Sequence, residues 1–146
     1  MTVHMIKLCV GAASIEDLAD WQARRLADNR KATGKAEIWH TTRMEPKRRD
    51  EMLDGGSLYW VIKGVIQVRQ TVTGFRQGAK ADGTPATLVL LDPALVPVRP
   101  TPRRAFQGWR YLEPGDAPPD MAASLASDLA RMPPRMRRDL AELGLI

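Results

Sequence analysis

The chain has few of the residues on which metal centres and disulfide-bonded folds depend. Of its 146 residues one is cysteine, Cys9, and two are histidine, His4 and His40. A lone cysteine cannot form an internal disulfide, and these three side chains do not make a zinc site of protein ligands. We therefore expect no metal and no cofactor. Cys9 lies within the apolar run IKLCV, and we interpret it as a buried, unreactive thiol.

Long hydrophobic runs and targeting signals are also missing. No run approaches the roughly 20 apolar residues that span a bilayer, and the start, MTVHMIKLCVGAAS, has no basic region followed by a long apolar core. These absences predict a cytoplasmic protein with no membrane partner. The length predicts one domain, residues 1–146, with a β-rich core over about residues 1–112 and a C-terminal helical hairpin over about residues 120–146.

Acidic residues are absent from two stretches of a chain whose net charge is +5. Residues 55–81 and residues 93–112 each contain four cations and no acid. An uncompensated positive field favours a polyanion as partner. The alternative is that exposed strand and loop positions happen to carry basic residues.

Hydrophobic spacing predicts an α+β fold. Strands are expected over residues 3–10, 37–43, 57–63, 65–72 and 86–91, and the Asp82-Gly83 turn should join two of them in a hairpin. Residues 106–112 should form a last short strand or a pinned loop. We interpret Gly64 as a bulge, a bend or part of one long coiled strand. The prolines after Asp92 should interrupt any regular ladder and leave residues 99–104 extended on the surface.

Helical patterns flank these strands. Ser14 is a typical N-cap for a helix of period 3.6, and Gly55-Gly56 suits the end of a short helix within residues 44–54. Asp120 can cap a further helix that Pro133-Pro134 interrupts. The prediction is a bent, mainly antiparallel sheet or small barrel of five to seven strands, with the first helix against one opening. The C-terminal hairpin either covers this sheet or forms a homodimer.

Catalytic motifs are weak. The sequence has no Gly-x-Ser-x-Gly elbow, and the glycines at 74 and 78 are not followed by the Lys-Ser or Lys-Thr of a phosphate loop. His40 could form an acid–base pair with Asp50 or Glu51 if the short helix folds back onto the second strand. The alternative is a hydrogen-bonded structural histidine, and we expect no catalytic residue.

Cations that occur together with flat rings are the stronger signal. Guanidinium groups match phosphates, and aromatic rings stack on unpaired bases. The candidate ligand-binding residues are Arg43, Lys47, Arg48, Arg49, Tyr59, Trp60, Lys63, Arg103, Arg104, Gln107, Trp109 and Arg110. Among them, Tyr59, Trp60 and Trp109 are the candidates for stacking.

The segments RMEPKRRDEMLDGGSLYWVIKGVIQVRQ and PRRAFQGWRYL resemble a known family. Over nearly its whole length the chain is similar to uncharacterised alphaproteobacterial proteins grouped as domain of unknown function 1489. This resemblance implies a stand-alone cytoplasmic bacterial protein and brings no activity with it.

The order of elements also resembles PUA-like barrels and their ASCH and EVE relatives. That resemblance implies binding of RNA or modified bases in a cleft beside the barrel, although the family's Gly-Asp turn and the ASCH signature Gly-x-Lys-x-x-Glu-x-Arg are missing. From the cations and flat rings we expect a non-catalytic module for single-stranded or modified RNA or DNA, because rings can hold only unstacked bases. The alternatives are a small hydrolase or nucleotide-processing enzyme that uses His40, and a protein-interaction subunit.

Overall fold

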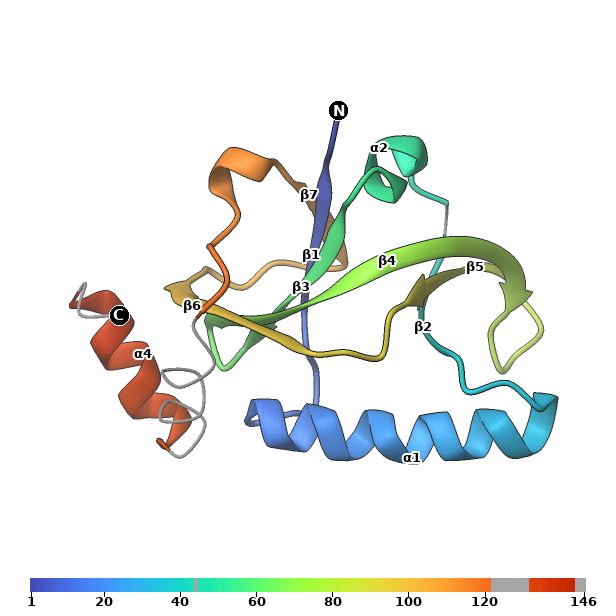
Figure 1. Cartoon of the computed structure of the whole chain (residues 1–146), viewed down its shortest axis with the longest axis horizontal. Coiled ribbons are helices and arrows are strands. Elements are labelled where there is room, and N and C mark those ends of the chain that lie inside the picture. The colour runs from blue at the N-terminus through green and yellow to red at the C-terminus, as the bar shows by residue number, and fades with distance from the viewer. Residues whose placement is uncertain (44, 122–131, 144–146) are drawn as a thin grey trace.

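The computed structural model describes residues 1–43, 45–121 and 132–143. In this part of the chain seven strands form one bent sheet in the order β2-β5-β4-β3-β1-β7, with β6 paired to β4 (Figure 1). Every pair is antiparallel except β1 with β3. The expected α+β class with a bent, mainly antiparallel sheet is confirmed. The strands are β1 (His4–Leu8), β2 (Ile38–Thr42), β3 (Ser57–Ile62), β4 (Val65–Ala79), β5 (Pro85–Leu91), β6 (Val96–Pro102) and β7 (Trp109–Leu112).

The long strand β4 produces the bend. Its first half pairs with β3 on one side and β6 on the other, and its second half pairs with β5. The register shifts between Val72 and Gly74, where β5 replaces β6 as the neighbour. Irregular pairing of this kind increases the local twist. The sheet therefore curls around a core instead of lying flat.

Two expectations about local structure need correction. Lys63 and Gly64, with φ of 52° and 77°, form the tight turn of the β3–β4 hairpin, so Gly64 is neither a bulge nor part of a continuous strand. Two successive residues with positive φ are typical of a type I′ turn, which matches the twist of the flanking strands. The proline-rich segment is extended as expected. However, as β6 it also pairs with β4, with a register shift between Ile66 and Val68.

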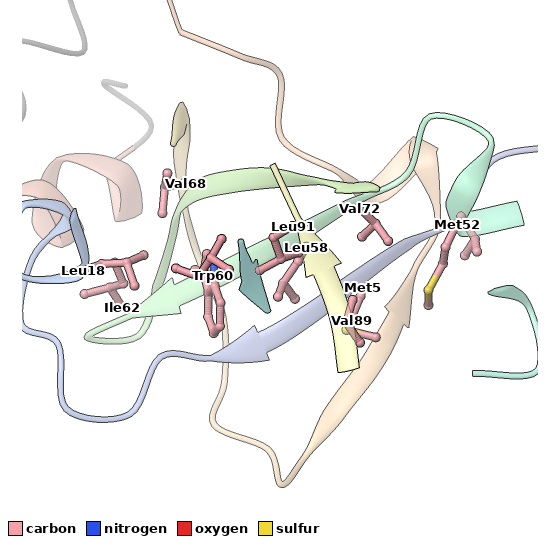
Figure 2. Close-up of a cluster of buried hydrophobic side chains, with 12 residues drawn as sticks. Met5, Leu18, Met52, Leu58, Trp60, Ile62, Val68, Val72, Val89 and Leu91 are labelled. Carbon is pink, nitrogen blue, oxygen red and sulfur yellow. The ribbon is translucent and has the colours of Figure 1, made fainter. Parts of the chain in front are cut away.

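Helices close the two ends of the sheet. Helix α1 (Ile15–Thr33) begins at Ser14, whose side chain accepts a hydrogen bond from the Asp17 amide, and it ends at the left-handed Gly34. It lies across the end where β1 finishes, whereas the short helix α2 (Arg49–Leu53) lies at the end where β1 starts (Figure 1). Figure 2 shows this arrangement in the core, with Leu18 of α1 at one extreme and Met52 of α2 at the other.

The C-terminal helix α4 (Pro134–Glu142) lies outside the sheet beside β6 (Figure 1). A buried arginine anchors it, because Arg137 is 1% exposed and its Nη1 donates to Gln67 Oε1 at 2.8 Å. The helix expected between Asp120 and Met132 falls on residues 122–131, outside the described residues. Before them, a short 3-10 helix, η1 (Pro114–Asp116), leads to Asp120, which forms a bridge with Val98 of β6.

Candidate functional site

A cavity of about 580 Å³ lies where β1 ends and α1 begins. Its volume falls within the roughly 300–1,000 Å³ of small-molecule sites. The walls carry both signs of charge, hydrophobic side chains and two rings from the sheet. They consist of Lys7, residues 8–12, His40 and Trp60 from the sheet and its first loop, and Asp17, Leu18, Asp20, Trp21 and Arg24 from α1.

Strand pairing places three of the relevant side chains in one row. Lys7 is opposite Trp60 on β3 and opposite Trp109 on β7. Directly paired residues on neighbouring strands point to the same face of a sheet. The row Trp109, Lys7, Trp60 therefore faces α1, and its Lys7 and Trp60 line the cavity. Trp109 is half-buried beyond Lys7, with its ring centroid 5.0 Å from that of Tyr111.

His40 completes this wall as an uncharged ring. Its centroid lies 5.7 Å from that of Trp60, with the two planes nearly perpendicular. Burial, and then the nearby Lys7 ammonium group, lowers the pKa of His40 to about 4. At neutral pH the imidazole is therefore neutral and offers one donor and one acceptor.

A buried network of amides holds Trp60 in place. The indole Nε1 donates to Gln70 Oε1 at 2.8 Å, and Gln70 forms a reciprocal amide pair with Gln22 of α1. Gln70 also donates to the carbonyl of Asp92 at 3.1 Å. The orientation of the ring is thus set before any ligand arrives, which reduces the entropy lost on binding.

Cys9 also lines the cavity and is half-buried instead of buried as expected. Burial raises the pKa of its thiol to about 11. The thiolate is the reactive form of cysteine, so the side chain is protonated and unreactive at neutral pH.

The candidate cations around α2 lie at the opposite end of β1 from the cavity. Arg48 binds Glu51 through Nε at 2.7 Å and Glu113 through Nη1 at 2.6 Å. Arg49 pairs with Glu45, and its guanidinium lies 5.5 Å from the Phe75 ring centroid. Arg43 and Lys47 are exposed in the same region.

The remaining candidates are distributed over the other end and the other face of the sheet. Lys63 and Arg103 meet at the β3–β4 turn, where the Arg103 amide donates to the Gly64 carbonyl at 2.9 Å, and exposed Arg104 follows. Gln107 is exposed in the next loop, and the guanidinium of Arg110 lies 5.3 Å from the Phe106 ring centroid. The structure therefore does not bring the twelve candidates into one groove.

Tyr59 is 4% exposed and points to the face opposite Trp60. It lines a second cavity of about 320 Å³ with His4, Ser57, Arg69 and Asp120. There the Arg69 guanidinium forms two hydrogen bonds of 2.7 Å to Asp120 and one of 3.0 Å to the Ser57 hydroxyl. Internal partners already occupy this arginine, so the larger cavity is the better candidate site.

Sequence reasoning missed several cavity residues: Lys7, Asp17, Asp20, Trp21 and Arg24. Lys7 carried a usable signal, since it is a charged residue inside the first apolar strand. The α1 residues look like an ordinary solvated helix face in the sequence. The acid–base pair considered as an alternative, His40 with Asp50 or Glu51, does not occur among the contacts described, because Glu51 pairs with Arg48 and Asp50 lies beside Arg49.

Comparison with protein families gives a match over residues 5–146 to DUF1489, described as a protein of unknown function. The chain belongs to this family. Neither the curated proteins nor the solved structures contain a significant match. The resemblance to PUA-like barrels stays a prediction. Among the helices of the described residues, none is long and apolar enough to cross a membrane.

Proposed function

We propose that this protein is a cytoplasmic nucleic-acid-binding module whose cavity takes an unpaired or modified base of single-stranded RNA or DNA. The observation that carries the proposal is the cavity wall formed by Trp60, Lys7 and His40, in which Lys7 lies beside Trp60 on the neighbouring strand and the His40 ring meets the Trp60 ring edge-to-face. Base–aromatic stacking contributes roughly 1–3 kcal/mol per base. An unpaired base is the part of a nucleic acid that can reach such a wall.

The charges around the cavity suit the edge of a base better than a phosphate alone. Lys7 and Arg24 are donors, whereas Asp17 and Asp20 are acceptors. Neutral His40 can donate and accept. A base edge presents both donors and acceptors, and single-stranded ligands expose these edges for hydrogen bonding. A phosphate would be repelled by the two carboxylates.

Binding of fluorescein-labelled 12-nucleotide RNA and DNA, and of bulk transfer RNA as a source of modified bases, tests the proposal. Lys7→Met and Arg24→Gln should each weaken binding about tenfold, since each removes a charged donor from the cavity. Lys31→Gln is the matched control because it removes a cation from an exposed position on α1 away from the cavity. If no probe binds at micromolar concentration, or if the three variants behave alike, the proposal is wrong.

A second function, hydrolysis, is suggested by the presence of His40 in the cavity with Asp17 and Asp20. A general base works best with a pKa near the working pH, whereas that of His40 is lowered to about 4. We therefore favour binding. Incubation of the 12-nucleotide probes with the protein, followed by gel analysis, should leave them intact. Cleavage that His40→Ala abolishes would instead establish the enzyme.

A further inference from the structure

Four cations from three separate segments gather at the β3–β4 turn. Lys63 forms the turn, Arg103 is hydrogen-bonded to Gly64, and Arg104 follows Arg103. Arg138 of α4 adds a guanidinium whose Nη1 donates to the Lys63 carbonyl at 3.4 Å. We call Lys63, Arg103, Arg104 and Arg138 the turn patch. Arg138 comes from a helix that gave no such signal in the sequence.

In the described part of the chain, no acidic side chain neutralises the turn patch. None of its four cations forms an ion pair with a residue among 1–43, 45–121 and 132–143. Elsewhere, by contrast, Arg48, Arg49, Arg69 and Arg76 each have a carboxylate within ion-pair distance. Like charges held together repel one another, so the patch gains most from an anion supplied from outside.

The backbone at Lys63 supports a role beyond the turn itself. Lys63 is the non-glycine residue with positive φ in the described chain, at 52°. Asparagine or glycine adopts this conformation more easily, and Asn-Gly is the usual pair in such a turn. A lysine at this position therefore places a charge at the tip of the hairpin at the expense of some stability.

Helix α4 is fixed in a position that presents Arg138. The adjacent Arg137 is buried, with Nη1 bonded to Gln67 and Nη2 bonded to the Met132 carbonyl. Its Nε is buried without a hydrogen-bond partner among the described residues. Such a group is costly to bury. The anchor nevertheless holds Arg138 against the Lys63 turn.

The turn patch lies at the same end of the sheet as the cavity. Trp60 precedes Lys63 by three residues of β3, which is about 10 Å along a strand. Next to it, the Cys9 amide in the cavity wall donates to the Val61 carbonyl at 2.8 Å. The patch is therefore within reach of a strand of a few nucleotides whose base occupies the cavity.

We propose that the turn patch binds the phosphodiester backbone of the strand whose unpaired base enters the cavity. This inference rests on the proposed function and narrows it, because it makes the ligand a strand of several nucleotides and not a free base or nucleotide. The guanidinium groups bind phosphate oxygens, and the base provides the contacts inside the cavity.

The double variant Lys63→Asn/Arg138→Gln tests the patch with the labelled 12-nucleotide RNA. Asparagine suits the turn, so the variant should fold. Lys35→Gln/Lys80→Asn is the matched control, with the same change in charge at exposed positions in the α1–β2 and β4–β5 connections, which lie far from α4 (Figure 1). Each phosphate contact on a single strand contributes about 0.7 to the slope of log affinity against log salt, so the slope should fall by about 1.4. When the salt concentration is raised from 50 to 200 mM, the affinity of both proteins falls. The fold-loss of affinity should be about seven times smaller for the patch variant than for the parent protein.

The outcomes separate this inference from the proposed function. Loss of affinity in Lys7→Met with an unchanged salt slope in the patch variant would overturn the patch and leave the cavity proposal in place. Unchanged binding in Lys7→Met with a reduced slope in the patch variant would overturn both, since the patch would then act without the cavity. Patch-dependent binding to vesicles of anionic phospholipid that exceeds binding to RNA would assign the patch to a membrane surface instead.

Discussion

The two ends of the sheet use their basic residues in opposite ways. Where β1 and β3 start, Arg48 joins Glu51 of α2 to Glu113, and its amide binds the Tyr111 hydroxyl at 3.2 Å. Where these strands finish, the cations of the turn patch have no acidic partner among the described residues, and a cavity opens beside them. At the first end charge connects elements, whereas at the second end Arg137 does so among the described residues, and the turn patch is left without a carboxylate there.

A count of cations in the sequence could not reveal this difference. The run EPKRRDE interleaves bases with acids three and four residues apart, and that spacing brings them together on a helical turn. The arginines of this run are therefore largely neutralised by acidic residues of the same run. The acid-free stretches gave a mixed signal. A cation there finds no carboxylate nearby in the chain, yet Arg69 and Arg76 pair with Asp120 and Glu37 from distant segments.

The largest effect on stability is expected from Gly56→Ala, at the end of the sheet where β3 starts. A Cβ at Gly56 would overlap the carbonyl oxygens of Met52 and Val3, both of which belong to backbone that cannot move aside. We expect a loss of about 4 kcal/mol or more in the free energy of unfolding, measured by urea denaturation. Gly115→Ala, where nothing lies within 4 Å of the new atom, should change it by less than about 0.5 kcal/mol. Equal effects would show that the ends are not packed as described.

The next largest loss of stability is expected from Gln70→Leu, which lies beneath the cavity. It leaves the Trp60 indole and the Gln22 amide buried without their partner, which we expect to cost about 3 kcal/mol of unfolding free energy. Gln77→Leu on the exposed part of the same strand is the control and should lie within about 0.5 kcal/mol of the parent. A small effect of Gln70→Leu would mean that Trp60 does not depend on the amide network.

The pH dependence of stability should report the burial of His40. Its pKa falls from 6.5 to about 4 on folding, so between these values the unfolded state binds the proton more tightly. The stability that the protein gains from keeping His40 neutral is fully present above pH 6.5 and is lost as the pH falls towards 4. From pH 7 to pH 4.5 the parent should lose about 2–3 kcal/mol more than His40→Gln. Parallel profiles of the two proteins in urea denaturation would contradict the buried, neutral ring.

The smallest effect on stability is expected in the turn patch, where Lys63→Asn should stabilise the fold. Lys63→Asn replaces a lysine at positive φ by a residue that adopts this conformation more readily. We expect the free energy of unfolding to rise by about 0.5–1 kcal/mol in thermal or urea denaturation. Lys80→Asn, in the other hairpin and without positive φ, is the control and should show no such gain. A loss of stability in Lys63→Asn would mean that the charge itself stabilises the fold.

Much of the fold could be predicted because its signals are local. The Ser14 cap and the Asp82-Gly83 turn are read from neighbouring residues, and the structure has the helix and hairpin that they predict. The Lys63-Gly64 turn was missed because lysine is unusual at positive φ. The β6 pairing was missed because prolines concealed an edge strand. The cavity could not be predicted, since its walls come from four elements.

The sequence by itself determined the elements, their caps and the sign of the charge, because hydrophobic period and turn chemistry act over a few residues. The tertiary structure alone decided that β1 lies between β3 and β7, which sets Lys7 between Trp60 and Trp109. It also brought Arg69 to Asp120 and Arg76 to Glu37. The pairings of β1 join residues 53 to 108 positions apart, and they depend on how the whole sheet closes around its core and not on any local pattern.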